Sequence, residues 1–252
     1  MPAVSAKLYE LSVMVWKGED PPSHWLRGIL VSIWKTGRYP RSDLDNHRGI
    51  SLLTWTGKVL SVCLNDRLTK VAQQAVDPAQ AGFTPARSCD DVTFAIRRII
   101  EDYIRSPSNP LSEFYDVEDD NDLYILFVDF EKAYDTVPRR VLYYLLREKY
   151  DIPEHIVALI RKLHERLELA PAVQKHTGGS FTPKVGLQQG GVMSPTLWNL
   201  YLNCVIQAWR SRLGKGHWGV PVTHCRDGRL RTATQMRGKQ EKFLTRILDM
   251  ES

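Results

Sequence analysis

The chain has 252 residues, 43% of them hydrophobic, and a formal net charge of +5. A chain of this length and composition can bury a core, which excludes an intrinsically disordered protein and favours one large globular domain or two small ones. No stretch of about 18 apolar residues occurs, and residues 1–17 lack the uninterrupted apolar segment of a secretory leader. We therefore expect neither a membrane span nor export.

Hydrophobic periodicity predicts helices and strands in alternation, without an internal repeat. The predicted helices cover residues 3–17, 58–76, 90–104, 136–150, a segment that begins at Pro153, and 195–209. Strands are predicted at residues 29–34 and 123–130. Ser88 is a plausible N-cap for the helix at 90–104, because its hydroxyl can accept a hydrogen bond from a first-turn amide.

The four cysteines are far apart in the sequence and form no Cys-x-x-Cys pair. They are Cys63, Cys89, Cys204 and Cys225. Such spacing favours reduced thiols in an intracellular protein, and it does not distinguish nucleus from cytoplasm.

Charge is unevenly distributed along the chain. Residues 205–252 carry ten Lys or Arg and four Asp or Glu, whereas residues 1–204 carry 24 and 25. A basic tail is compatible both with phosphate contact and with a solvated surface segment. Residues 111–122 are rich in Asp and Glu and follow two prolines, which predicts a hydrated acidic loop rather than a cation site.

The central predicted strand ends in a carboxylate. The sequence there reads Ile125-Leu-Phe-Val-Asp129-Phe-Glu-Lys-Ala-Tyr134-Asp135. The absence of polar alternation before Asp129 predicts an interior strand that is covered on both faces. Since an unpaired buried charge is costly, we expect Asp129 to meet a cation, a donor or water at a cleft.

A glycine-rich loop precedes the predicted helix at residues 195–209. It reads Gly186-Leu-Gln-Gln189-Gly190-Gly-Val-Met-Ser194-Pro195. Ser194 and Pro195 suit the start of a helix, whose amide donors then point toward the glycines. Such a terminus is a reasonable place for a nucleotide or a base-paired template.

These two segments resemble motifs A and B of a reverse transcriptase. Further upstream come Trp34-Lys35, Asn46-His-Arg48-Gly-Ile-Ser-Leu-Leu and Gln80-Ala-Gly-Phe-Thr-Pro-Ala-Arg-Ser. The five segments in this order resemble the reverse transcriptase of a LINE-type non-LTR retrotransposon over roughly residues 20–205. Five motifs in order are a much more specific signal than any one of them.

The resemblance implies a mixed α/β (α+β) fold, with the fingers and a partial palm of a right-hand polymerase and no thumb. The fingers would be residues 1–110 and the acidic loop 111–122. The palm, with inserted fingers helices, would be 123–209, and a basic connection would be 210–252. The implied activity is RNA-directed DNA polymerase, with an RNA template, a DNA primer, deoxynucleoside triphosphates and Mg²⁺ or Mn²⁺.

The resemblance also implies roles for single residues. Asp129 matches the first metal-binding, catalytic aspartate, assisted by the Phe130 carbonyl. Tyr134 matches the aromatic gate that rejects a ribose 2′-OH, although an ordinary packing aromatic is the alternative. The residues expected beside the nucleotide are Gln189, Gly190, Arg48 and Lys35. For Lys35, a plain surface lysine is an equal alternative.

Nucleotidyl transfer assisted by two metal ions needs carboxylates that coordinate both ions. In the family these follow in a Tyr-Ala-Asp-Asp hairpin, whereas this sequence ends Asp249-Met250-Glu251-Ser252. We therefore expect a chain truncated before that motif, which does not polymerise as written, and which self-associates through an open sheet edge. The alternative function is a non-catalytic remnant that binds nucleic acid or protein.

Overall fold

The structure is a computed structural model of the chain and describes residues 2–105, 125–173, 176–212, 221–223 and 242–244. The chain divides into two compact units. The first comprises Met1–Val76 and Glu131–Val205, and the second comprises Asp77–Phe130 and Ile206–Ser252. Helices and strands are mixed along the sequence, which confirms the predicted α/β fold class.

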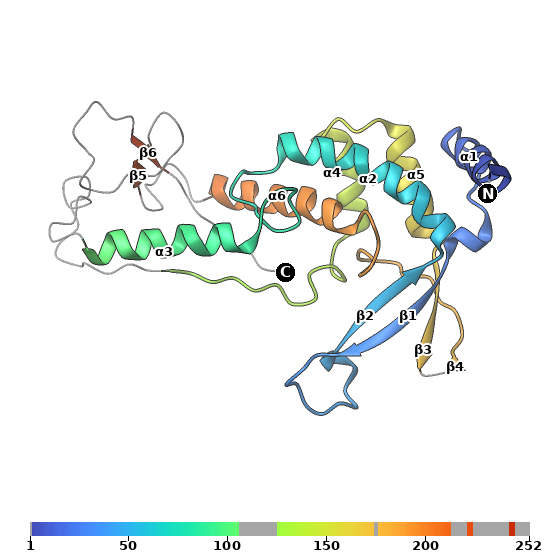
Figure 1. The fold of residues 1–252 in the computed structure, drawn as a ribbon, viewed down its shortest axis with the longest axis horizontal. Coiled ribbons are helices and arrows are strands. Elements are labelled where there is room, and N and C mark those ends of the chain that lie inside the picture. The colour runs from blue at the N-terminus through green and yellow to red at the C-terminus, as the bar shows by residue number, and fades with distance from the viewer. Residues whose placement is uncertain (1, 106–124, 174–175, 213–220, 224–241, 245–252) are drawn as a thin grey trace. The chain divides into compact units, whose positions relative to one another are not determined.

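The first unit contains a four-stranded mixed sheet with strand order β2-β1-β3-β4 (Figure 1). Strand β1 (Arg27–Trp34) runs antiparallel to β2 (His47–Leu53) and parallel to β3 (Glu168–Val173). The short β4 (His176–Thr177) pairs antiparallel with β3. The strand predicted at residues 29–34 is confirmed: it corresponds to β1, which pairs with β2 on one side and with β3 on the other. Strand β2 was not predicted.

The helices supply most of the buried apolar core of the first unit. They are α1 (Pro2–Trp16), α2 (Trp55–Ala75), α4 (Arg139–Glu148), α5 (Glu154–Glu165) and α6 (Ser194–Arg212), of which α6 continues into the second unit. The side chains of these helices that are less than 2% exposed include Leu64, Leu142, Leu146, Ile160 and Leu197. Short 3₁₀ turns cover Ser23–Leu26 and Leu44–Asn46. Each predicted helix of this unit is confirmed within a few residues.

Polar contacts fix α6 against its neighbours. The hydroxyl of Thr196 donates to Asn65 of α2 at 2.8 Å. Two residues before the end of the unit, the amide group of Asn203 donates to the Ala75 carbonyl at 3.0 Å and to the Tyr150 hydroxyl at 3.1 Å. Because buried polar groups need such partners, these bonds hold α6 in one position relative to α2. They thereby fix the start of α6, where the glycine-rich loop ends.

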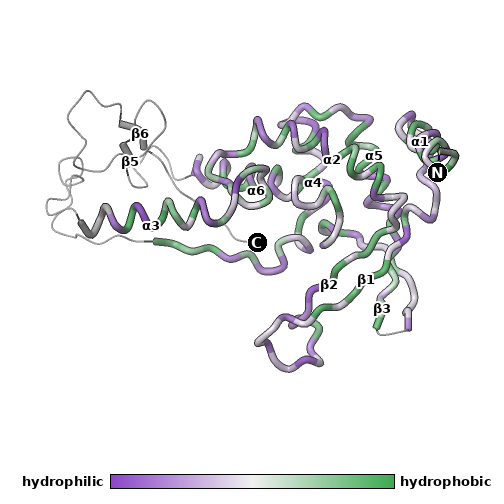
Figure 2. Tube along the Cα trace, viewed as in Figure 1, coloured by the Kyte–Doolittle hydropathy of each residue, from purple (hydrophilic) through white to green (hydrophobic). Residues whose placement is uncertain are grey.

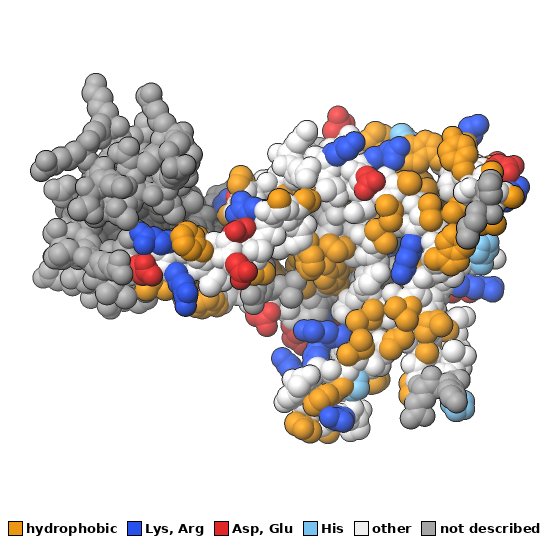
Figure 3. All heavy atoms as spheres, viewed as in Figure 1, with side chains coloured by type: hydrophobic (Ala, Val, Ile, Leu, Met, Phe, Trp, Pro, Cys, Tyr) orange, Lys and Arg blue, Asp and Glu red, His pale blue; other side chains and the backbone are white. Residues whose placement is uncertain are grey.

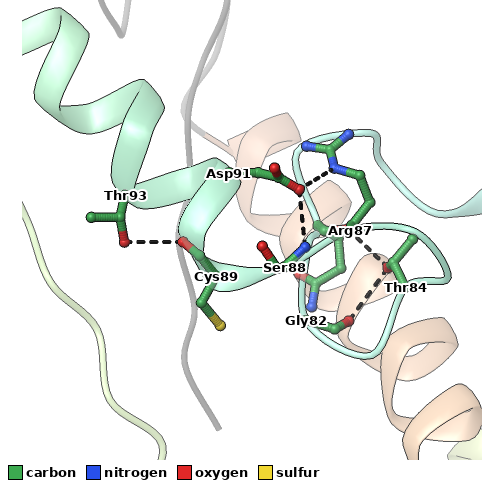
Figure 4. A network of polar contacts seen from close by, with 8 residues as sticks. Gly82, Thr84, Arg87, Ser88, Cys89, Asp91 and Thr93 are labelled. Carbon is green, nitrogen blue, oxygen red and sulfur yellow. Dashed lines mark hydrogen bonds and ion pairs between the residues drawn. The ribbon is translucent and has the colours of Figure 1, made fainter.

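The second unit contains α3 (Cys89–Arg105), an amphipathic helix along which hydrophobic and hydrophilic residues alternate (Figure 2). Its N-terminus is ordered by local polar contacts (Figure 4). The carboxylate of Asp91 accepts a hydrogen bond from the Ser88 amide at 2.9 Å and lies 3.3 Å from Nε of Arg87. This is the reciprocal half of a capping box, and it places Ser88 where an N-cap was predicted.

Residues 125–130 differ from their prediction. They form no strand, and the side chains of Ile125, Leu126, Phe127 and Val128 are 42–77% exposed. The expectation of an interior strand covered on both faces is therefore wrong, and Asp129 at the end of this run is exposed. An apolar run becomes an interior strand only if strands or helices cover it. In the described residues, no strand pairs with this segment.

Several predictions fall on residues outside the described part of the chain. The acidic loop 111–122 lies there, as do the terminal acids and most of the basic connection. Within that connection, β5 (Pro221–Thr223) pairs antiparallel with β6 (Lys242–Leu244). Cys63, Cys89 and Cys204 are free thiols. None of the described helices has the length and apolar character needed to cross a membrane.

Candidate functional site

The glycine loop, which we define as residues 186–193, is fixed to the turn that follows residue 130. The amide of Leu187 donates to the Tyr134 carbonyl at 2.7 Å. Gly186 is buried and has a φ of +80°, and a Cβ there would lie 2.7 Å from the Asp135 carbonyl oxygen. Only glycine combines this backbone conformation with so close an approach. Tyr134 and Asp135, which end the segment that resembles motif A, therefore contact the start of the segment that resembles motif B.

The opposite side of the glycine loop contacts strand β2. The Ser51 amide donates to the Gln189 carbonyl at 2.6 Å. Gly190 has a φ of +95°, and a Cβ there would lie 2.6 Å from the Ser51 carbonyl oxygen. The family resemblance implies that Gly190 lies beside the nucleotide, where the absence of a side chain permits close approach. The structure adds a second reason for glycine, which is the contact with the β2 backbone.

Arg139 joins the glycine loop to two other segments, and sequence reasoning did not identify it. The side chain is 6% exposed and donates to the carbonyls of Gly186 at 2.8 Å, Pro183 at 2.6 Å and His164 at 3.1 Å. Burial lowers the pKa of the Arg139 guanidinium. The adjacent Arg140 is exposed, so position within the sequence gave no signal that distinguishes the two arginines.

His164, whose carbonyl accepts a hydrogen bond from Arg139, is 3% exposed. Its Nδ1 lies 3.0 Å from the Tyr143 hydroxyl, and the two rings are stacked with centroids 6.1 Å apart. Burial, with a smaller contribution from the Arg139 charge, lowers the pKa of His164 to about 3. The imidazole is therefore neutral at physiological pH, and the buried arginine does not face a second positive charge.

Tyr134 is half-buried at the turn between residue 130 and α4. Its ring packs against Trp198 of α6, with centroids 5.7 Å apart and planes tilted by 32°. Burial raises the pKa of Tyr134 to about 12, so the phenol stays protonated. The contact with Trp198 holds the ring in place, as either a gate or a packing aromatic requires.

A cluster of charged and amide side chains surrounds this turn. The Lys132 ammonium lies 2.8 Å from the Asp45 carboxylate, and the Lys35 ammonium donates to the Asp45 carbonyl at 3.1 Å. Partial desolvation raises the pKa of Asp135, and this effect is opposed by Lys132, by a hydrogen bond from Gln189 and by Lys35. The cluster therefore places the side-chain amide of Gln189 and the ammonium groups of Lys132 and Lys35 near the Asp135 carboxylate.

The two predicted fingers cations lie on one hairpin. Arg48 is exposed on β2, directly opposite Ile33 of β1, and Lys35 is half-buried one residue beyond the end of β1. Ser51, three residues after Arg48, makes the contact with the glycine loop. The structure thus brings Lys35, Arg48, Tyr134, Gln189 and Gly190 into the first unit. This set combines two cationic side chains with an aromatic ring and a backbone loop, and guanidinium and ammonium groups are the side chains that suit phosphate.

The comparison with known families decides what kind of protein this is. A sequence model described as "Reverse transcriptase (RNA-dependent DNA polymerase)" matches residues 34–226, which is more than half of the chain. The chain belongs to the reverse transcriptase family. The match begins at Trp34 and includes the hairpin cations, the Tyr134 turn and the glycine loop.

A curated relative of this reverse transcriptase chain is the retrovirus-related Pol polyprotein from type-2 retrotransposable element R2DM of Drosophila melanogaster. It is 25% identical over 208 residues, which are 81% of the present chain and 18% of the relative. The chain therefore spans about a fifth of the length of this relative. Together the two similarities confirm the resemblance to the reverse transcriptase domain of a non-LTR retrotransposon.

Reverse transcriptases act with divalent cations, so the fit of the residues to Mg²⁺ matters. Asp129 and Phe130 belong to the second unit, and the Asp129 carboxylate is exposed. Among the described residues, no group of three His, Cys, Asp or Glu side chains is arranged to hold a metal ion. One carboxylate and a carbonyl fit part of a Mg²⁺ shell that substrate phosphates complete, but they do not fit a pair of ions.

Proposed function

We propose that this chain is the deoxynucleotide- and template-binding part of a reverse transcriptase. The observation that carries the proposal is the position of the glycine loop, which is hydrogen-bonded to Tyr134 on one side and to Ser51 on the other. These bonds connect the gate residue, the Gln189 amide and the hairpin that carries Arg48 through the backbone of one compact unit.

The proposed roles follow from the chemistry of each side chain. Arg48 and Lys35 bind the triphosphate, the first as a planar fork of donors and the second as a point charge. Tyr134 occupies the space that a ribose 2′-OH would need. Gln189 and Gly190 lie beside the base pair. By the family resemblance, Asp129 with the Phe130 carbonyl would hold a Mg²⁺ ion, which when bound supplies charge neutralisation.

We further propose that the 252-residue polypeptide does not extend a primer by itself. Nucleotidyl transfer needs carboxylate ligands for two metal ions. Asp129 supplies one carboxylate, which is not enough to hold both ions. Asp135 is directed to Gln189 and the lysines, so its electrostatic environment does not favour a metal role. A product that continued into a Tyr-Ala-Asp-Asp segment would supply the missing acids.

Self-association is a related proposal, and it rests on exposed apolar surface rather than on a strand edge. Leu126 and Phe127 are 77% and 76% exposed. Contiguous apolar side chains of this kind favour association between copies. Replacing Leu126 and Phe127 together by lysine should shift a concentrated sample toward monomer in light scattering. A wild-type chain that is monomeric at high concentration would contradict the proposal.

The experiment that tests the main proposal is binding of dATP in Mg²⁺ to the full chain, measured by calorimetry. Arg48→Gln should weaken binding by about tenfold or more, the loss expected for a charged hydrogen bond. Arg140→Gln, which removes an exposed arginine on α4, is the matched control and should leave binding unchanged. Absence of dATP binding by the wild type, or equal effects of the two variants, would refute the nucleotide site.

Catalytic incompleteness is tested separately with a primed RNA template, deoxynucleotides and Mg²⁺ or Mn²⁺. We expect no extension. Extension that is abolished by Asp129→Asn would show that the polypeptide is a complete polymerase. Nucleic-acid binding without dATP binding would instead favour the alternative of a non-catalytic remnant.

A further inference from the structure

The loop between β1 and β2, which we call the hairpin tip (residues 35–46), is held by hydrogen bonds to its backbone carbonyls. Nε1 of Trp34 donates to the Arg38 carbonyl at 2.7 Å, and the Asn46 amide group donates to the Pro40 carbonyl at 3.0 Å. Nε2 of His47 lies 2.8 Å from the Arg41 carbonyl. Because three side chains hydrogen-bond to the carbonyl groups of residues 38, 40 and 41, the shape of the outer loop is set before any ligand arrives.

This framework presents an aromatic ring and a guanidinium group on the surface. The Arg41 guanidinium lies over the Trp34 ring, 4.0 Å from its centroid. The Tyr39 ring meets Trp34 edge-on, with centroids 5.8 Å apart. Tyr39 is 75% exposed, and Arg41 and Arg38 are exposed as well. Trp34 thus supports two planar groups that face solvent.

The charge around these groups is mainly positive. The segment 35–48 contains four cations, Lys35, Arg38, Arg41 and Arg48, and two carboxylates, Asp43 and Asp45. Both carboxylates are engaged: Asp43 accepts from the Asp45 amide at 3.0 Å, and Asp45 is paired with Lys132. Figure 3 shows Lys and Arg side chains beside hydrophobic ones at the loop end of the β1–β2 hairpin.

Planar groups interleaved with cations match one ligand chemistry. Unpaired nucleobases stack on tyrosine rings and on guanidinium planes, while neighbouring cations bind the phosphates. We propose that Tyr39 and Arg41, supported by Trp34, form a stacking platform for a single-stranded polynucleotide, with Arg38 as a phosphate contact. Recognition is through bases and phosphates, so the platform does not distinguish ribose from deoxyribose. The site is separate from the proposed dATP site and needs neither metal nor nucleotide.

The test measures binding of fluorescent oligonucleotides of roughly 12 nucleotides, within the usual range of single-strand site sizes. Oligouridylate and oligothymidylate are titrated with the full chain without Mg²⁺. Tyr39→Ala should weaken both by about 5- to 150-fold, since stacking on one aromatic ring is worth about 1–3 kcal/mol. Tyr9→Ala is the matched control, because Tyr9 is 73% exposed but lies on α1, and it should bind as wild type.

A second pair of variants separates stacking from charge. Arg41→Lys keeps the positive charge and loses the planar group, so it should weaken binding nearly as much as Arg41→Gln. Arg38→Gln should lower the salt dependence, by about 0.7 in the slope for one phosphate contact to a single strand. Electrostatic binding elsewhere on the chain would be the same in all variants and would fall as salt is raised, so the comparisons are repeated at raised salt.

Tyr39→Trp keeps a planar ring and should retain binding, which distinguishes loss of stacking from a misfolded loop. The proposal is overturned if Tyr39→Ala and Tyr9→Ala bind alike, or if Arg41→Lys binds as wild type. It is also overturned if the variants weaken binding of only one of the two oligonucleotides. Since dATP binding is measured independently, its failure would leave this test intact.

Discussion

The amide nitrogen of Ser51 lies 2.6 Å from the carbonyl oxygen of Gln189. This hydrogen bond joins β2, which carries Arg48, to the loop that resembles motif B. The same loop donates to the Tyr134 carbonyl on its other side. Three segments that are far apart in the sequence therefore reach the candidate nucleotide site through backbone contacts, and substitutions that separate them should affect both stability and binding.

Gly190→Ala should destabilise the first unit. Its φ of +95° is strained for alanine, and the added Cβ would lie 2.6 Å from the Ser51 carbonyl oxygen. We expect a loss of about 1–3 kcal/mol in the free energy of unfolding, measured by urea denaturation. Gly179→Ala is the control, because nothing lies within 4 Å of its added Cβ. Equal stability of the two variants would contradict the close contact.

Arg139→Ala should be among the most destabilising single changes in this unit. It leaves three carbonyl groups without the guanidinium that now binds them, and a hydrogen bond with a charged partner contributes about 1.5–3 kcal/mol. We expect a loss of about 3 kcal/mol or more and faster hydrogen exchange at the Gly186 and Leu187 amides.

Arg140→Ala changes the neighbouring exposed residue and should cost less than about 0.5 kcal/mol. Arg139→Lys should recover part of the loss, since a single ammonium cannot reproduce the guanidinium geometry. If Arg139→Ala left the exchange of the glycine loop unchanged, Arg139 would not be a positioning residue for that loop.

The stability of the protein should fall in acid partly because of His164. Its pKa is lowered to about 3 in the folded protein from an ordinary 6.5, so between these pH values the unfolded chain binds the additional proton. This contribution is complete above about pH 6.5 and is lost as the pH falls toward about 3. His164→Asn should flatten that part of the profile of unfolding free energy against pH.

The exposed His155 on α5 provides the control. His155→Asn should leave the wild-type slope between about pH 6.5 and 4 unchanged, because it removes a solvent-exposed imidazole and keeps the buried His164 in place. Parallel profiles for His164→Asn and wild type would show that the buried imidazole does not account for the acid sensitivity.

Tyr134 offers a direct choice between a gate and a packing residue. Tyr134→Ala removes the ring that contacts Trp198 and should destabilise the unit by about 3 kcal/mol under either role. Only a gate also controls sugar selection, so the variant should then lose the preference for dATP over ATP in binding assays. Tyr134→Phe should keep both stability and preference. A preserved preference in Tyr134→Ala would identify Tyr134 as a packing aromatic.

Sequence reasoning located the segments of the candidate site but not the contacts that join them. Glycine is informative because few residues adopt its conformations, so Gly186 and Gly190 identified a constrained loop before the structure located Asp135 and Ser51 against it. Arg139 was missed because a buried and an exposed arginine look the same in one sequence. Its guanidinium binds the carbonyls of residues 164, 183 and 186, which are 25 to 47 positions further along the sequence.

The apolar run at residues 125–130 shows the converse error. A strand prediction from hydrophobicity assumes that other elements cover both faces, and the described residues supply no pairing strand. Strand β2 was overlooked for a related reason: His47, Arg48 and Ser51 interrupt its apolar residues. Its pairing with β1 over seven residue pairs, and not its own composition, makes it a strand.

The parallel pairing of β1 with β3 has a consequence for biosynthesis. Arg27 pairs with Glu168, about 140 residues further along the chain. At a ribosomal rate of roughly 5–20 residues per second, the edge of β1 waits about 7–30 s for its partner. During this interval the nascent hairpin has one unpaired side, which is the condition under which a chaperone would be most useful.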